Sequence, residues 1–204
     1  MSPAPAALLC LASMSPRRRA LLEQIGVPHV VQAADIDESL AAAESPQSYV
    51  VRMARAKACA VRARGVTLPV LAADTTVVVD GALCGKPHDE AAAIAMLQRL
   101  SGRTHQVLTA VALATAHDCA CSLSASEVRF RPLLAAECAR YWRSGEPRDK
   151  AGGYAVQGLA AVFIEHLSGS YSGVMGLPLF ETAQLLRAAG IGYWQGTPEE
   201  PRSA

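Results

Sequence analysis

The chain has 204 residues, of which 51% are hydrophobic and 18% charged, and its formal net charge is +1. This size predicts one folded domain over residues 1–204 with a sizeable core, ending in a disordered Pro-, Glu- and Ser-rich tail from about residue 196. The near-neutral charge argues against nucleic-acid and membrane-surface binding, and no apolar run reaches the ~20 residues of a membrane span. Because the first eleven residues also lack a signal-peptide pattern, the expected location is the cytoplasm.

The first predicted element is a short strand over residues 6–11, which leads directly into a helix. Ser15 suits the N-cap and Pro16 the first helical position. Three consecutive arginines, starting at Arg17, then oppose the helix dipole unless an anion binds there. The hydroxyls of Ser13 and Ser15, the free backbone N–H groups and the guanidinium groups of Arg17 and Arg18 therefore predict a phosphate site. The alternative is a solvated basic turn.

Charged residues also mark the next two elements. A strand over residues 29–34 precedes an acidic segment that contains Glu38. This segment is either a solvated loop or a source of hard-cation ligands. The helix predicted over residues 46–64 carries Lys57 on its apolar face, between Met53 and Val61. Such a lysine either extends its amine to solvent or reaches a phosphate in a pocket.

The most informative stretch runs from Leu68 to Pro87. Its apolar run predicts a strand, covered on both faces, that ends at Asp74. A carboxylate there is costly unless it is paired, solvated or bound to a cation. The following Asp80-Gly81 predicts a two-residue hairpin loop whose register places Lys86 opposite Thr75. The stretch is therefore either a strand-end salt bridge or a catalytic site.

The second half of the chain predicts a helix over residues 89–100, an antiparallel pair over 104–114 and 119–131, and a helix around residues 134–141. Gln157 is expected inside a strand that continues to Leu167, where its amide can read a nucleobase edge. A glutamine satisfied by neighbouring backbone is the alternative. A Gly/Ser loop over residues 169–178 precedes the last helix.

Eight short motifs follow one another between Leu8 and about Leu186: Ser13-x-Ser15-Pro16-Arg17-Arg18, Asp37-Glu38, Arg55-x-Lys57-Ala58, Ala73-Asp74-Thr75, Gly85-Lys86-Pro87, Asp149-Lys150-Ala151-Gly152, Gln157-Gly158 and Gly176-Leu177-Pro178. In this order they resemble the Maf family of nucleoside triphosphate pyrophosphatases. The resemblance implies an α/β fold related to the inosine triphosphate pyrophosphatase (ITPase) architecture, with an elongated mixed β-sheet flanked by helices in two lobes and a central cleft. It also implies Mg²⁺- or Mn²⁺-dependent hydrolysis of a nucleoside triphosphate to the monophosphate and pyrophosphate.

The positions of Arg17, Thr75 and Gln157 resemble the branch of this family that acts on dTTP and UTP, and modified pyrimidine nucleotides are further candidate substrates. Two alternatives stay open, namely a 7-methyl-GTP pyrophosphatase of the sister branch and a non-catalytic nucleotide-binding regulator of cell division. A homodimer is suggested by the resemblance alone.

These observations assign a role to each candidate residue. Asp74 is the candidate general base or water-orienting group, with Glu38 as a second ligand of the divalent metal. Gln157 and Thr75 are expected to face the pyrimidine. The phosphates are expected to contact Ser13, Ser15, Arg17, Arg18, Lys57 and Lys86.

Overall fold

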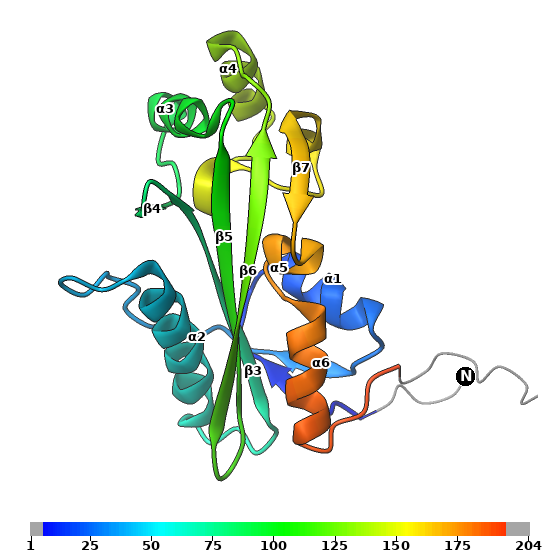
Figure 1. The fold of residues 1–204 in the computed structure, drawn as a ribbon. Coiled ribbons are helices and arrows are strands. Elements are labelled where there is room, and N and C mark those ends of the chain that lie inside the picture. Colours follow the sequence, from blue (N-terminus) through cyan, green and yellow to red (C-terminus); the bar gives the residue numbers. More distant parts are fainter. Residues whose placement is uncertain (1–5, 195–204) are drawn as a thin grey trace, which may run out of the picture.

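A mixed sheet of seven strands runs through the computed structural model, which describes residues 6–194 (Figure 1). The strand order is β2-β1-β3-β5-β6-β7. Strand β5 pairs along one edge of β3, and β1 and β4 pair with the two ends of its other edge. The three strands β1, β2 and β3 are parallel to one another, and all other pairs are antiparallel. The strands are β1 (Leu9–Leu11), β2 (His29–Val31), β3 (Val70–Val79), β4 (Ala82–Cys84), β5 (Thr104–Ala114), β6 (Cys119–Phe130) and β7 (Ile164–Ser168).

The predicted hairpin forms, but β3 does not end at Asp74. Val79 pairs with Ala82 across the Asp80-Gly81 loop, and both loop residues have positive φ, as a two-residue hairpin turn requires. Pairing with β4 stops at Cys84, so Lys86 lies beyond the ladder. Asp74 lies in the middle of β3, because its charge is paired within the protein and does not have to terminate the strand.

The lower lobe in Figure 1 consists of helices on both faces of the sheet. Helix α2 (Pro46–Arg62) covers one face, and its Ser45 cap accepts a hydrogen bond from the backbone N–H of Ser48. The opposite face is covered by α1 (Pro16–Gln24) and α6 (Leu179–Ala188), whose leucines pack against β1 and β3. Each helix presents an apolar side to the sheet, which explains why the two faces of the lower lobe have separate hydrophobic clusters.

The upper lobe has its own hydrophobic cluster around Phe130. Helices α3 (Glu90–Leu100) and α4 (Ala135–Arg143) contribute to it, together with two 3₁₀ helices, Ala151–Gly153 and Leu159–Phe163. The short helix α5 (Tyr171–Met175) lies between the upper lobe and α6. Strands β3, β5 and β6 extend through both lobes, so the region between the lobes is built on continuous strands.

The prediction of a strand around Gln157 is wrong. Residues 154–158 form loop and turn, Leu159–Phe163 is a 3₁₀ helix, and only Ile164–Ser168 is a strand. Three backbone donors of this segment bond to side chains from elsewhere in the upper lobe and two bond to carbonyls within the segment, so these donors need no neighbouring strand.

The described fold is the predicted α/β fold with a mixed sheet between helices. Among residues 6–194, no helix has the length and apolar character that crossing a membrane requires. The tail predicted from residue 196 lies outside the described residues, and the single-domain boundary stays a prediction.

Candidate active site

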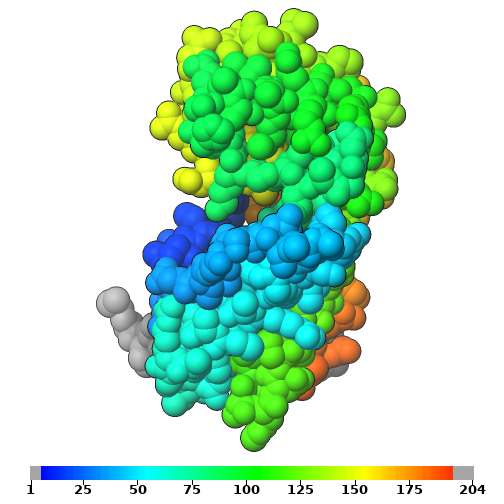
Figure 2. Space-filling model, turned by 90° about the vertical axis from the view of Figure 1, so that its left-hand side faces the viewer, coloured from blue at the N-terminus to red at the C-terminus, as the bar shows by residue number. Residues whose placement is uncertain are grey.

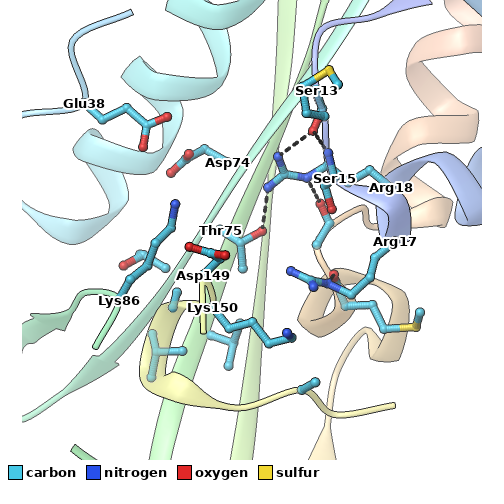
Figure 3. Close-up of a pocket in the computed structure, with 18 of the residues that line it drawn as sticks. Ser13, Ser15, Arg17, Arg18, Glu38, Asp74, Thr75, Lys86, Asp149 and Lys150 are labelled. Atoms are coloured by element: carbon cyan, nitrogen blue, oxygen red, sulfur yellow. Dashed lines mark hydrogen bonds between the residues drawn. The ribbon is translucent and has the colours of Figure 1, made fainter. Parts of the chain in front are cut away.

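A cavity of about 770 Å³ lies where the two lobes meet, at the level of the hollow visible in Figure 2. Its volume is in the range of small-molecule sites. All ten candidate residues line it, although they come from six separate parts of the chain: Ser13, Ser15, Arg17, Arg18, Glu38, Lys57, Asp74, Thr75, Lys86 and Gln157. Figure 3 shows most of them and their orientation toward a common space.

Strand β3 supplies Asp74 and Thr75 on its two opposite faces. Successive side chains of a strand alternate, so Asp74 points toward α2 and Thr75 toward α1. Lys57 of α2 approaches Asp74, with 2.6 Å between its Nζ and Asp74 Oδ1, and both residues are less than a tenth exposed. The lysine predicted on the apolar face of α2 is therefore buried in an ion pair.

Glu38 binds the same ammonium group from the other side. Its Oε1 lies 2.8 Å from Lys57 Nζ, so two carboxylates converge on one cation. Burial alone raises the pKa of Glu38, but the hydrogen bond and charge of Lys57, assisted by Lys86 and Arg18, outweigh burial and lower it. Glu38 is consequently ionised at neutral pH.

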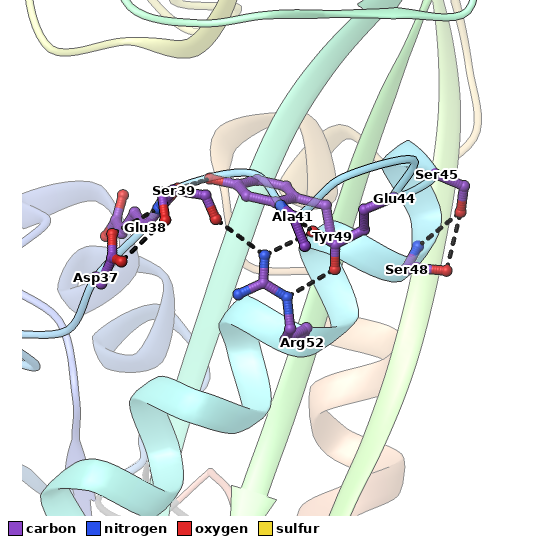
Figure 4. A network of polar contacts seen from close by, with 9 residues as sticks. All are labelled: Asp37, Glu38, Ser39, Ala41, Glu44, Ser45, Ser48, Tyr49 and Arg52. Atoms are coloured by element: carbon purple, nitrogen blue, oxygen red, sulfur yellow. Dashed lines mark hydrogen bonds and ion pairs between the residues drawn. The ribbon is translucent and has the colours of Figure 1, made fainter.

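Glu38 belongs to a segment without helix or strand that side chains of α2 hold in place (Figure 4). Tyr49 donates its hydroxyl to the backbone carbonyl of Glu38 at 3.0 Å. Arg52 donates to both carboxylate oxygens of Glu44, with 2.6 Å between Nε and Oε1, and to the carbonyl of Ser39 at 3.0 Å. This bidentate contact closes the segment onto α2 and places Glu38 over the cavity.

Arg18 occupies the opposite side of the cavity from Glu38. Its guanidinium donates to the carbonyl of Gly176 at 2.8 Å, to Ser13 Oγ at 3.3 Å and to Thr75 Oγ1 at 3.4 Å. Thr75 Oγ1 also lies 3.0 Å from Thr109 Oγ1, which in turn lies 2.7 Å from the carbonyl of Gly173. Because the single proton of Thr109 goes to this carbonyl, Thr75 donates its own proton to Thr109 while it accepts from Arg18. These bonds orient Arg18 at the base of the α1 turn.

Ser15 is the N-cap residue of α1, as predicted, but its side chain makes no capping bond. Its backbone N–H instead donates to Ser13 Oγ at 3.2 Å, and both serines line the cavity. The first turn of α1 contains no acidic residue, so no side chain of this turn balances the positive end of the helix dipole. The turn is suited to an anion.

A basic corner lies beside this turn. Burial lowers the pKa of Arg17, and burial together with the charge of Arg17 lowers the pKa of Lys150. Lys86 enters the cavity from the hairpin, as Figure 3 shows. Because the charge of Arg17 disfavours the protonated form of Lys150, an anion bound beside both side chains would stabilise the two positive charges.

Tyr49, Asp149 and Lys150 also line the cavity, although no role was predicted for them. The motif Asp149-Lys150-Ala151-Gly152 was a signal for two of them, because a cation beside paired small residues suits close approach to a ligand. Gly152 has a φ of +69° and its Cα faces Val77, where a Cβ would lie 2.7 Å from a methyl carbon. Tyr49 had no such signal.

Cations and acids in the cavity nearly balance. Five basic side chains line it, Arg17, Arg18, Lys57, Lys86 and Lys150, against four acids, Asp35, Glu38, Asp74 and Asp149. This balance is far short of the roughly four negative charges of a nucleoside triphosphate at neutral pH. A divalent cation beside the carboxylates would supply part of the missing positive charge.

Fold and cavity together define a two-lobed α/β protein whose interlobe cleft is lined by serines, cations and carboxylates. The model of the family described as "Maf-like protein" matches residues 8–189. The chain is 53% identical over 183 residues to the dTTP/UTP pyrophosphatase of Methylobacillus flagellatus, covering 89% of this chain and 92% of that one. It is 54% identical over 189 residues to the dTTP/UTP pyrophosphatase of Alkalilimnicola ehrlichii, covering 90% and 93%. It is 51% identical over 191 residues to that of Saccharophagus degradans, covering 92% and 91%. This chain belongs to the Maf family.

Proposed function

We propose that this protein hydrolyses dTTP and UTP to the nucleoside monophosphate and pyrophosphate. The relatives described above carry this activity in their names, and they match about nine tenths of the chain. The observation that carries the proposal is the convergence of all ten candidate residues on one cavity. Residues this far apart in sequence share a cavity of ligand size only because the fold brings them together.

The triphosphate binds along the basic side of the cavity. Arg17 and Arg18 present planar forks that suit phosphate oxygens, and Ser13 and Ser15 add hydroxyls next to the α1 N-terminus. Lys86 approaches from the opposite lobe, so the phosphates are held from both lobes.

Asp74 orients the attacking water. Lys57 contacts Oδ1, and the side chain lines the cavity, so Oδ2 can accept a hydrogen bond from a water molecule. The water oxygen bonds to the α-phosphorus, the bond from that phosphorus to the bridging oxygen breaks, and pyrophosphate leaves with the electron pair. The proton released from the water passes to Asp74 and then to solvent.

Glu38 and Asp74 suit a divalent ion such as Mg²⁺ or Mn²⁺. Among residues 6–194, no group of three or more His, Cys, Asp and Glu side chains is arranged to hold a metal. Glu38 and Asp74 nevertheless lie close enough to contact the same ammonium group of Lys57. Two such carboxylates fit Mg²⁺, which typically takes one or two carboxylates and completes its shell with water and phosphate oxygens. When bound, the ion neutralises phosphate charge and stabilises the departing pyrophosphate.

The base lies toward Gln157, at the exposed end of the cavity. Its amide has one donor and one acceptor in one plane, which complements the adjacent N–H and carbonyl of uracil or thymine. We expect the enzyme to act in the cytoplasm, and a homodimer stays a prediction.

The test is product analysis with purified protein, dTTP and Mg²⁺. The proposal requires dTMP and pyrophosphate, whereas thymidine diphosphate and orthophosphate would show that a different bond is cut. Asp74→Asn should lose at least about a hundredfold in kcat and stay folded, because Lys57 keeps its contact with Glu38. A variant with normal kcat would exclude Asp74 from the reaction.

A further inference from the structure

The turn that presents Gln157 is held from within by one carboxylate. Glu146, just after α4, accepts hydrogen bonds from the backbone N–H of Leu159 at 3.0 Å and of Ala160 at 3.3 Å. Its Oε1 also accepts the hydroxyl proton of Tyr141 at 2.7 Å. Two backbone donors that follow Gln157 and one hydroxyl of α4 thus converge on a single side chain.

Tyr141 extends this network to the other side of Gln157. Its hydroxyl oxygen accepts a hydrogen bond from the backbone N–H of Ala155 at 3.1 Å. Tyr141 is 5% exposed, and its ring packs edge-on against Phe163 at 5.3 Å between ring centroids. The hydroxyl is therefore fixed in the upper-lobe core, and the turn is anchored both before and after Gln157.

The space between the turn and Glu146 is filled. A Cβ built on Gly158 would lie 2.2 Å from Glu146 Oε2, so the residue after Gln157 must be glycine while the carboxylate is in place. Burial alone raises the pKa of Glu146, but the hydrogen bonds from Leu159, Tyr141 and Ala160 outweigh burial and lower it. The anchor is an ionised carboxylate, which makes stronger hydrogen bonds than a neutral group.

We propose that Glu146 and Tyr141 are positioning residues that fix Gln157 where its amide distinguishes uracil from cytosine. The inference rests on the proposed function, in which Gln157 reads the base. A glutamine amide can offer its donor and acceptor in either order, and cytosine reverses the pattern that uracil presents. Discrimination therefore depends on where the amide is held, and the anchored turn sets that position.

The test compares UTP with CTP, which differ only at the base edge. Tyr141→Phe removes the bridging hydroxyl, keeps the ring packing and leaves the charge of the site unchanged. We expect the ratio of kcat/KM for UTP to that for CTP to fall about three- to tenfold, since a hydrogen bond contributes about 0.5–1.5 kcal/mol. The amides of residues 155–160 should also exchange faster with deuterated water. Tyr171→Phe, at a half-exposed tyrosine outside the cavity, is the matched control and should change neither quantity.

Two further variants separate positioning from general stability. Gly158→Ala should displace the Glu146 carboxylate and reduce the ratio like Tyr141→Phe, which keeps the proposal testable if one of the variants fails to fold. In a Gln157→Ala background, Tyr141→Phe should no longer change the ratio. If Tyr141→Phe lowers thermal stability but leaves the UTP to CTP ratio of kcat/KM unchanged, the proposal is overturned. It is also overturned if Tyr141→Phe changes this ratio equally in the wild-type and Gln157→Ala backgrounds.

Equilibrium binding separates this proposal from the proposed function. If the wild-type protein binds nucleotide but releases no pyrophosphate, the proposed function fails. The ratio of UTP to CTP affinities, measured by calorimetry in EDTA, then decides the positioning role by the same criteria. Absence of binding for both nucleotides would overturn both.

Discussion

Lys57→Met tests whether Glu38 and Asp74 form a cation site. The substitution keeps the length and apolar stem of the side chain but removes the charge that both carboxylates contact, at 2.8 and 2.6 Å. Asp74 is 7% exposed, so it loses its partner in a desolvated position, whereas the half-exposed Glu38 side chain can turn to water. Two neighbouring carboxylates without a cation repel each other.

The size of the effect follows from this burial. Removing one partner of a buried ion pair costs about 3–5 kcal/mol, and the exposure of Glu38 favours the lower end, about 3 kcal/mol. For a chain of this length, each 1 kcal/mol shifts the melting temperature by about 2–4 °C, so we expect a decrease of about 6–12 °C. Mn²⁺ at about a hundred times its dissociation constant should restore about 2.7 kcal/mol.

The assay is thermal unfolding with and without Mn²⁺. Lys57→Met should gain more from Mn²⁺ than the wild type, because in the wild type the lysine already neutralises the carboxylates. The matched control is Arg129→Met, which breaks an exposed ion pair with Glu165 and should cost less than about 1 kcal/mol. A Lys57→Met variant that melts within about 2 °C of the wild type, or equal Mn²⁺ effects on both proteins, would refute the reasoning.

Two further predictions concern pH and the loop that carries Glu38. Burial lowers the pKa of His105 to about 4, so between pH 6.5 and 4 the unfolded chain binds a proton that the folded chain does not. The free energy of unfolding, measured with urea, should therefore be about 2 kcal/mol lower at pH 5 than at pH 7. His105→Phe should reduce this difference, whereas the control His88→Gln, at an exposed histidine, should not. An equal pH dependence in the wild type and both variants would show that His105 is not the group responsible. Arg52→Gln should lower kcat/KM about tenfold, because it releases the segment that carries Glu38, and Arg52→Lys should recover part of the loss. Unchanged steady-state kinetics of Arg52→Gln would show that the contact with Glu44 is not needed.

Much of the fold could be predicted because local signals agreed with the tertiary structure. The Asp80-Gly81 hairpin, the helix predicted over residues 89–100 and the apolar face of α2 depend on spacings of a few residues. The segment from Tyr154 to Phe163 could not be predicted this way. Its apolar composition indicates a strand, but three of its backbone donors bond to the side chains of Tyr141 and Glu146, which lie 13 or 14 residues earlier in the chain. No local pattern carries that information.

The two least favourable local choices in the sequence explain each other. Lys57 is a cation on the apolar face of a helix, and Asp74 is an anion in a buried strand, so each alone would be expensive. For Asp74 considered by itself, a place at the end of its strand would avoid the cost of burying a charge. Because α2 packs on the face of β3 toward which Asp74 points, the two charges meet at 2.6 Å, and β3 can continue to Val79. A buried ion pair adds little net stability over apolar side chains, so stability alone does not account for this pair. Its position on the wall of the cavity, with Glu38 as a third charged group, is better explained by the binding of a charged substrate.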